Sequence, residues 1–411
     1  MRLGDRSRAP CNPDVRTMLQ PEFPCIGFVV ESTIRRIESS PRLLLRPRCR
    51  PQVSCVRDAR PPHGQFAPHG SHRLPAVEVD SYNVELKDNE GFIGDRASKG
   101  AFRNMIDQIR KTLRKSGDDP LGEEDSDELS KAELDSLLLQ GEPEAAGIIH
   151  AAIEEFSQEF ALIIQRYLKL KEWKNTERIV IGGGFRASRI GELVTGRTSV
   201  ILKAQKIDVE LIPIRNHPDE AGLLGAVHLA PVWMFKAFDA VLAVDIGGTN
   251  IRAGIVQLNL KKSNTLEKAK VWKFSLWRHG DEDNVKREHA IVQLGSMLKG
   301  LIGSAGKKRL KLAPFIGIGC PGVIEEDGSI DRGAQNLPGN WESSKFNLPT
   351  ALYEMIPTVG EHETSIVLHN DAVVQGLSEL PFMQDVLHWG VLTIGTGLGN
   401  ARFTNRGAKE D

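Results

Sequence analysis

The chain has 411 residues, of which 40% are hydrophobic and 26% charged, values typical of a globular protein with room for two or three lobes. Its formal net charge of −1 gives no bulk attraction to nucleic acid or to a membrane surface. No apolar run in the sequence is long enough to span a bilayer, so an integral membrane protein is not expected.

Residues 1–75 differ from the rest of the chain in composition. They contain thirteen Arg, no Lys, six acidic residues, eleven of the 22 prolines and four of the five cysteines. A nucleic-acid-binding arm, a transit peptide, and a disordered or spurious extension all remain open. No hydrophobic period persists beyond one turn, which favours the last of these and argues against a nucleic-acid partner. The fifth cysteine, Cys320, fits a reduced, cytoplasmic protein.

Ordered structure is expected to begin near residue 74. Alternating residues predict a strand over 77–86, and a helix is expected over 101–114. The acidic, Gly- and Pro-punctuated residues 116–143 predict a surface excursion with a short helix at 131–139.

Helices and strands then alternate regularly. Elements expected before residue 236 are a long amphipathic helix at 149–167, strands at 178–181 and 208–214, a helix at 189–195, and a helix capped by Asn216 with Pro218 in its first turn. Strands expected after it are 240–244, 251–257, 271–275, 314–319, 365–369 and 390–394. Helices expected there are 289–302, 350–355 and 372–380. This alternation predicts an α/β protein whose sheets are covered by helices.

The strongest local motif runs from Asp245 to Asn250, where an apolar strand meets Gly247, Gly248, Thr249 and Asn250 before a second strand leaves. Glycines in such a hairpin allow backbone N–H groups to converge on an anion. Asp245, at the strand end, is a candidate ligand for Mg²⁺ or its waters. An isolated Gly-Gly pair would more often be an ordinary tight turn.

Two further glycine clusters follow strands. A second hairpin carries Gly395, Thr396 and Gly397, and two such hairpins are able to clamp a polyphosphate between them. A third cluster, Gly182, Gly183 and Gly184, lies between a strand and a helix, where flat backbone suits a nucleoside.

Asn370 and Asp371 lie where a strand ends and a helix starts. Asp371 alone would be interpreted as a helix N-cap. With phosphate-type loops on both sides, we interpret Asp371 as a carboxylate that accepts a proton from a substrate hydroxyl.

Two other loops suit a polar ligand. Residues 317–323 form a strand that runs into a Pro-Gly turn, and residues 336–341 offer the amide of Asn336 and the indole of Trp341. Trp341 fits a core anchor at least as well as a sugar platform, and Cys320 fits small packing better than a nucleophile.

Together these motifs resemble the ROK family of sugar kinases and sugar-responsive repressors, within the actin/hexokinase ATPase superfamily. The segments at 245–250, 319–322, 336–339, 370–371 and 395–397 follow in the family's order. The resemblance implies a two-lobed, ribonuclease-H-like α/β fold with a cleft between the lobes. It also implies glucokinase-like phosphorylation of a hexose or N-acetylhexosamine by ATP and Mg²⁺.

The family's adenosine motif comes last, whereas the similar Gly182–Gly184 precedes Asp245 here. Circular permutation accounts for this if residues 80–235 supply the usual C-terminal half and residues 236–411 the usual N-terminal half. The family's Glu/Gly-His element and zinc cysteines would then fall near residues 80–114, which hold neither His nor Cys. A structural zinc is therefore not expected.

The resemblance implies a role for each matching residue. Asp371 would be the base, Asn336 and Asn370 would join it in orienting the sugar, and Asp245 would position Mg²⁺. The three glycine clusters would hold ATP. A non-catalytic sugar sensor or repressor is the alternative, although residues 1–75 show no helix-turn-helix pattern. A homodimer is left open.

Overall fold

The computed structural model describes residues 68–263 and 265–406. Most of the compositionally distinct segment, residues 1–67, lies outside these ranges, so its expected disorder is not addressed. Residues 68–75, however, belong to the packed chain. His69 and Leu74 are buried, Gly70 N donates to Leu368 O at 3.0 Å, and Leu368 N donates to His69 Nδ1 at 3.0 Å. The expected boundary at residue 75 therefore falls inside the ordered part.

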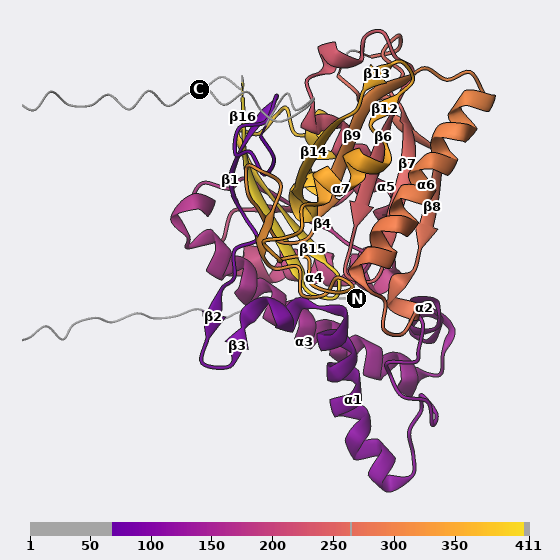
Figure 1. The fold of residues 1–411 in the computed structure, drawn as a ribbon. Coiled ribbons are helices and arrows are strands. Elements are labelled where there is room, and N and C mark those ends of the chain that lie inside the picture. The colour runs from indigo at the N-terminus through magenta and orange to yellow at the C-terminus, as the bar shows by residue number, and fades with distance from the viewer. Residues whose placement is uncertain (1–67, 264, 407–411) are drawn as a thin grey trace, which may run out of the picture. The chain divides into compact units, whose positions relative to one another are not determined.

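Two five-stranded sheets organise the described residues (Figure 1). The first has the order β1 (Val77–Tyr82), β16 (Leu398–Asn405), β15 (His388–Ile394), β4 (Arg178–Gly182) and β5 (Glu210–Pro213). The second has the order β14 (Ser365–Asn370), β9 (Leu312–Cys320), β6 (Ala240–Ile246), β7 (Ile251–Gln257) and β8 (Lys270–Trp277). In the first sheet β15 pairs in parallel with β4, so strands before and after residue 236 share one sheet.

Eight α-helices accompany the sheets in this part of the chain. They are α1 (Lys99–Ser116), α2 (Lys131–Gln140), α3 (Pro143–Leu168), α4 (Arg189–Ala204), α5 (Pro218–Ala226), α6 (Arg287–Lys307), α7 (Leu348–Met355) and α8 (Asp371–Leu377). The described residues also form short two-stranded pairs: β2 (Lys87–Asp88) with β3 (Gly91–Phe92), β10 (Val323–Ile324) with β11 (Ile330–Arg332), and β12 (Thr358–Val359) with β13 (His362–Glu363). The predicted α/β class is confirmed.

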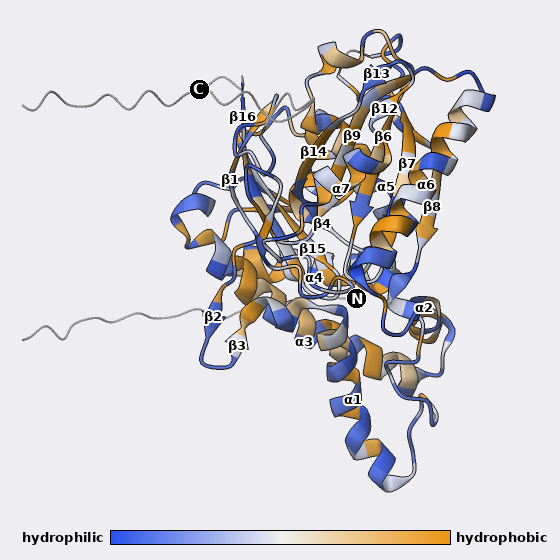
Figure 2. Ribbon diagram, viewed as in Figure 1, coloured by the Kyte–Doolittle hydropathy of each residue, from blue (hydrophilic) through white to orange (hydrophobic). Residues whose placement is uncertain are grey.

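Three hydrophobic clusters of described residues cover the sheets. One joins α1 to α4 with β4, a second joins α5 and α8 with strands of both sheets, and a third joins α6 and α7 with the second sheet. All seven residues of β6 are buried, as expected for a strand covered on both faces. Figure 2 shows hydrophobic colour along the central strands and mixed colour on α1 and α6. None of the described helices is apolar enough over a sufficient length to cross a bilayer.

Two local expectations were wrong. The strand expected over 77–86 ends at Tyr82, because Asn83 adopts a left-handed backbone with φ of 49°. The cap of α5 is His217, whose Nδ1 accepts from Asp219 N at 3.2 Å, whereas Asn216 donates to Ser378 O.

Candidate active site

Two carboxylates meet at one edge of the second sheet. Strands β6, β9 and β14 run parallel there, so their carboxyl ends coincide, and Asp245 pairs with Gly319 in register. Asp371 begins α8 directly after β14, and a Cβ on Gly319 would lie 3.5 Å from its Cα. The fold thus brings together Asp245 and Asp371, which are 126 positions apart in the sequence.

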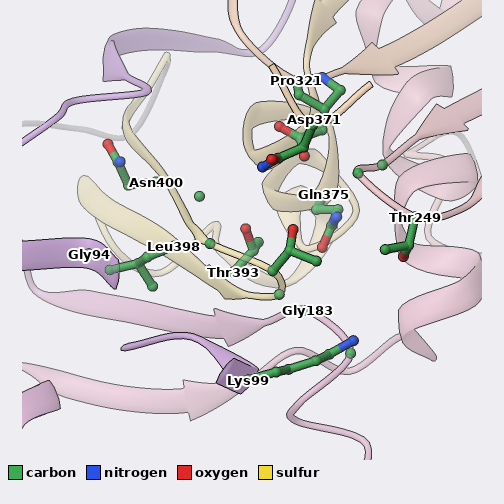
Figure 3. A pocket seen from close by; sticks show the side chains of 18 of the residues that line it. Gly94, Lys99, Gly183, Thr249, Pro321, Asp371, Gln375, Thr393, Leu398 and Asn400 are labelled. Atoms are coloured by element: carbon green, nitrogen blue, oxygen red, sulfur yellow. The ribbon is translucent and has the colours of Figure 1, made fainter. Parts of the chain in front are cut away.

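Asn370, not Asp371, caps α8. Its Oδ1 accepts from Ala372 N at 3.0 Å and from Val373 N at 3.3 Å, while its Nδ2 donates to Gly322 O at 3.0 Å. Asp371 makes one hydrogen bond of this kind, accepting from Ala372 N at 2.9 Å. The rest of its carboxylate faces the pocket (Figure 3). Since Asn370 already satisfies the helix start, capping does not account for Asp371.

The electrostatic setting raises the pKa of both carboxyl groups. Burial, followed by the charge of Asp245, raises the pKa of Asp371 to about 7. Burial also raises the pKa of Asp245, partly offset by Arg252, whose Nη1 lies 3.4 Å from Asp245 Oδ2. A carboxyl group with a pKa near neutrality is suited to accept and return a proton.

The two glycine hairpins face each other. A Cβ on Gly248 would lie 3.1 Å from Thr396 Oγ1 and 3.2 Å from Asn336 Cβ, so both hairpins and Asn336 converge on one spot. The first hairpin is closed by Gly247 N, which donates to Asn250 O at 2.8 Å, and is fastened by a hydrogen bond of 3.0 Å between His279 Nε2 and Gly247 O.

The third glycine cluster packs against the second hairpin. Gly183 has φ of +83°, and a Cβ there would come within 2.3 Å of Ile394 O, so the approach requires glycine. Phe185 N donates to the same carbonyl at 3.3 Å. Gly183 and Gly184 therefore lie beside the strand that carries the second hairpin.

A cavity of about 990 Å³ unites these features. Most residues proposed from the sequence line it: Gly183, Gly184, Asp245, Gly247, Gly248, Thr249, Asn250, Asn336, Asp371, Gly395, Thr396 and Gly397. Gly182 and Asn370 are not among the described residues that do. Gly182 ends β4 beside Thr393, and both polar ends of Asn370 have backbone partners.

Sequence reasoning missed several polar residues of the cavity wall. Asn83 Nδ2 and Gln375 Oε1 are buried without a hydrogen-bond partner among the described residues. Gln375 follows Asp371 by one helical turn, a spacing that would have revealed it. Asn83 gave no such signal, because a residue from the far end of the chain positions its segment. Asn400 Oδ1 accepts from the backbone N–H of Val84, next to Asn83, and Asn400 Nδ2 donates to the Val84 carbonyl.

The structure distinguishes between the two interpretations that the sequence allowed for Trp341 and for Cys320. Trp341 is 1% exposed, donates from Nε1 to Pro338 O at 2.8 Å and packs edge-on against Phe346, so it is a core anchor. Cys320 is buried, and burial followed by Asp371 and Asp245 raises the pKa of its thiol, which opposes a nucleophilic role.

The donor groups suit a hydrated dication and phosphates. Among residues 68–263 and 265–406 no cluster of three or more His, Cys, Asp or Glu side chains is arranged to enclose a metal ion. Mg²⁺, however, is usually held by one or two carboxylates with waters and substrate phosphates. Asp245, which lies beside Arg252, and Asp371, whose pKa is raised in part by the charge of Asp245, are carboxylates of that type.

These features define an α/β protein with a polar cavity built from opposed glycine hairpins and two carboxylates. No protein-family model matches the chain. A glucokinase from Thermotoga maritima is 30% identical over 168 residues, which are 40% of this chain and 44% of the glucokinase. The chain thus spans less than half the length of this curated relative.

Comparison with solved structures gives likenesses of limited extent. A candidate N-acetylmannosamine kinase from Listeria monocytogenes is 24% identical, with 40% of this chain and 47% of that chain covered and a TM-score of 0.29. A candidate sugar kinase from Cytophaga hutchinsonii is 16% identical, with 40% and 48% covered and a TM-score of 0.28. At these TM-scores the structural likenesses assign neither a fold nor a function to this chain.

Proposed function

We propose that this protein is a sugar kinase that transfers the terminal phosphoryl group of ATP to a hydroxyl of a hexose or N-acetylhexosamine. The observation that carries the proposal is the convergence of Asp371 with two opposed glycine hairpins in one cavity. The similarity to a glucokinase supports the reaction class. Because that similarity covers under half of the glucokinase, the sugar substrate and the use of ATP as donor are part of what we propose.

In this mechanism the backbone N–H groups of the hairpins 247–250 and 395–397 bind the donor phosphates. Asp245 would hold Mg²⁺ or its waters, and the bound ion would neutralise the charge of the donor phosphates. Asp371 accepts the proton of the sugar hydroxyl as its oxygen bonds to phosphorus and the bond to ADP breaks. Most of the acceleration comes from positioning and from prearranged dipoles.

The sugar would lie on the Asp371 side of the cavity, with Asn336 as one hydrogen-bonding partner. Asn83 is a further candidate because its Nδ2 lacks a partner and would lie 2.8 Å from a Cβ on Gly333. Asn370 would act indirectly, by holding Gly322 O and the start of α8. This replaces the direct sugar contact expected for Asn370.

The proposal includes membership of the ROK family and the permuted order, with residues 80–235 in place of the usual C-terminal half. The parallel pairing of β15 with β4 supports it, since the second hairpin and Gly182–Gly184 then lie on neighbouring strands. The non-catalytic sensor is not favoured, because Asp371 and both hairpins line one cavity.

A coupled ADP-release screen over common hexoses and N-acetylhexosamines tests the function, with Asp371→Asn as the inactive control. Turnover with at least one sugar that disappears in the variant supports the kinase. A protein that binds sugars and ATP but never releases ADP would leave the sensor as the better description.

A further inference from the structure

Two lysines enter the cavity from the starts of neighbouring helices. Ser98 caps α1 by accepting from Ala101 N at 3.1 Å, and Lys99 follows it. Ser130 caps α2 in a capping box with Glu133, and Lys131 follows it. Both lysines line the cavity, and Lys99 N donates to Gly395 O at 3.0 Å, which fixes the start of α1 on the second hairpin.

The two ammonium groups converge on Gly184. A Cβ built there would lie 3.3 Å from Lys99 Nζ and 4.0 Å from Lys131 Nζ, so the two nitrogens are no farther apart than the sum of these distances. Lys131 Nζ also donates to Gly184 O at 2.9 Å. Figure 3 shows Lys99 extended beneath Gly183, with its amino group directed toward the side of the cavity where Thr249 lies.

The positive charge at this point lacks a matching negative partner. Lys99 Nζ makes no hydrogen bond or ion pair with any residue of the described ranges. Burial, then the nearby charges of Lys131, Arg103 and Arg252, lower the pKa of Lys99, and Asp219 opposes them. Asp219, however, already pairs with Arg252 at 2.5 Å. Like charges held together in this way favour binding of an anion.

The shape of the cavity indicates the kind of anion. The opposed hairpins provide one backbone site, and the lysines provide a second site that begins at Gly395 and extends to Gly184. A single phosphate would occupy only one of these sites, whereas a linear chain of phosphates would reach both. Lysine suits such a ligand because it offers a mobile point charge without demanding bidentate geometry.

We propose that Lys99 and Lys131 bind the oligophosphate chain of the phosphoryl donor. The inference rests on the proposed kinase function for its biological role, although the binding itself does not require turnover. The ligand is a linear oligophosphate, carried either by a nucleoside triphosphate or by free inorganic polyphosphate. Neither lysine is supplied by a glycine motif. Lys99 lies in the segment near residues 80–114, where the zinc and Glu/Gly-His elements are absent, and Lys131 lies beyond it.

Titration calorimetry with inorganic tripolyphosphate, in the absence of sugar, tests the inference. We expect Lys99→Gln and Lys131→Gln each to weaken tripolyphosphate binding about tenfold, as for loss of one charge-assisted hydrogen bond. Lys99→Arg and Lys131→Arg should retain most of the affinity. AMP affinity should be unchanged in every variant. Lys115→Gln is the matched control, since Lys115 is an exposed lysine at the other end of α1.

The outcomes separate this inference from the kinase proposal. Failure of the wild type to bind tripolyphosphate, or unchanged affinity in a double Lys99→Gln, Lys131→Gln variant with a normal melting temperature, overturns the lysine site even if the protein phosphorylates sugars. Lysine-dependent binding supports the site even if no sugar is accepted. A second titration with ATP identifies the source: tighter binding of ATP assigns a nucleotide, and equal binding assigns free polyphosphate.

Discussion

Replacement of Asp371 by Asn tests both its charge and its catalytic role. Asn retains the size of the side chain and an Oδ1 that is able to accept from Ala372 N, as Asp371 does at 2.9 Å. The helix cap is untouched, because Asn370 provides it. The substitution therefore removes the ability to accept a proton while leaving the local hydrogen bonds in place.

The structure predicts a gain in stability with a definite pH dependence. The pKa of Asp371 rises from 3.8 to about 7 on folding, so the folded state binds more protons between these values. Stability contributed by this group is therefore present below about pH 4 and is lost as pH rises to 7. At pH 8 the Asn variant should be more stable by roughly 2 to 4 kcal/mol, the lower end reflecting the side of the carboxyl that faces the cavity.

The same variant should lose activity. Loss of a general base commonly lowers turnover about 10²- to 10⁴-fold, while ATP affinity should change little because the hairpins hold the phosphates. Wild-type turnover should fall as the pH is lowered and Asp371 becomes protonated, since a protonated carboxyl group cannot accept the hydroxyl proton.

Melting temperatures at pH 4 and pH 8, calorimetric ATP affinity and steady-state turnover are the measurements. Asp283→Asn, at an exposed carboxylate, is the control for loss of charge alone. Normal turnover in Asp371→Asn would refute the catalytic assignment. A melting temperature that does not rise at pH 8 would refute the electrostatic argument.

Three other perturbations address different parts of the molecule. Gly248→Val should weaken ATP binding at least about tenfold, because its side chain would enter the space between the hairpins, and unchanged calorimetric affinity would contradict that geometry. Asn83→Asp, which tolerates the left-handed backbone but loses the Nδ2 donor, should raise the KM of the accepted sugar about 3- to 10-fold with little change in kcat. An unchanged KM would place the sugar elsewhere. Deletion of residues 1–75 should lower the melting temperature relative to deletion of residues 1–67, because only the longer deletion removes the buried His69, and equal melting temperatures would contradict its structural role.

The sequence by itself determined where most of the helices and strands lie. The strand expected over 251–257 is β7 without adjustment, and the helix expected over 350–355 lies within α7. Period and turn chemistry are local properties, so they can be interpreted without knowledge of the fold. For the same reason Asp245, Asp371 and the glycine hairpins could be proposed as site residues from their positions at strand ends, and the structure places them around one cavity.

The tertiary structure decided which of these residues share a cavity and which others join them. Asn83 and Lys99 gave no signal in the sequence, because their partners are distant: Val84, next to Asn83, bonds to Asn400, and Lys99 N bonds to Gly395 O. The cap of α8 is likewise Asn370 and not Asp371, because Gly322 O, on another loop, accepts from the Asn370 amide and orients it. Such contacts depend on how remote segments pack, and local propensity carries no information about them.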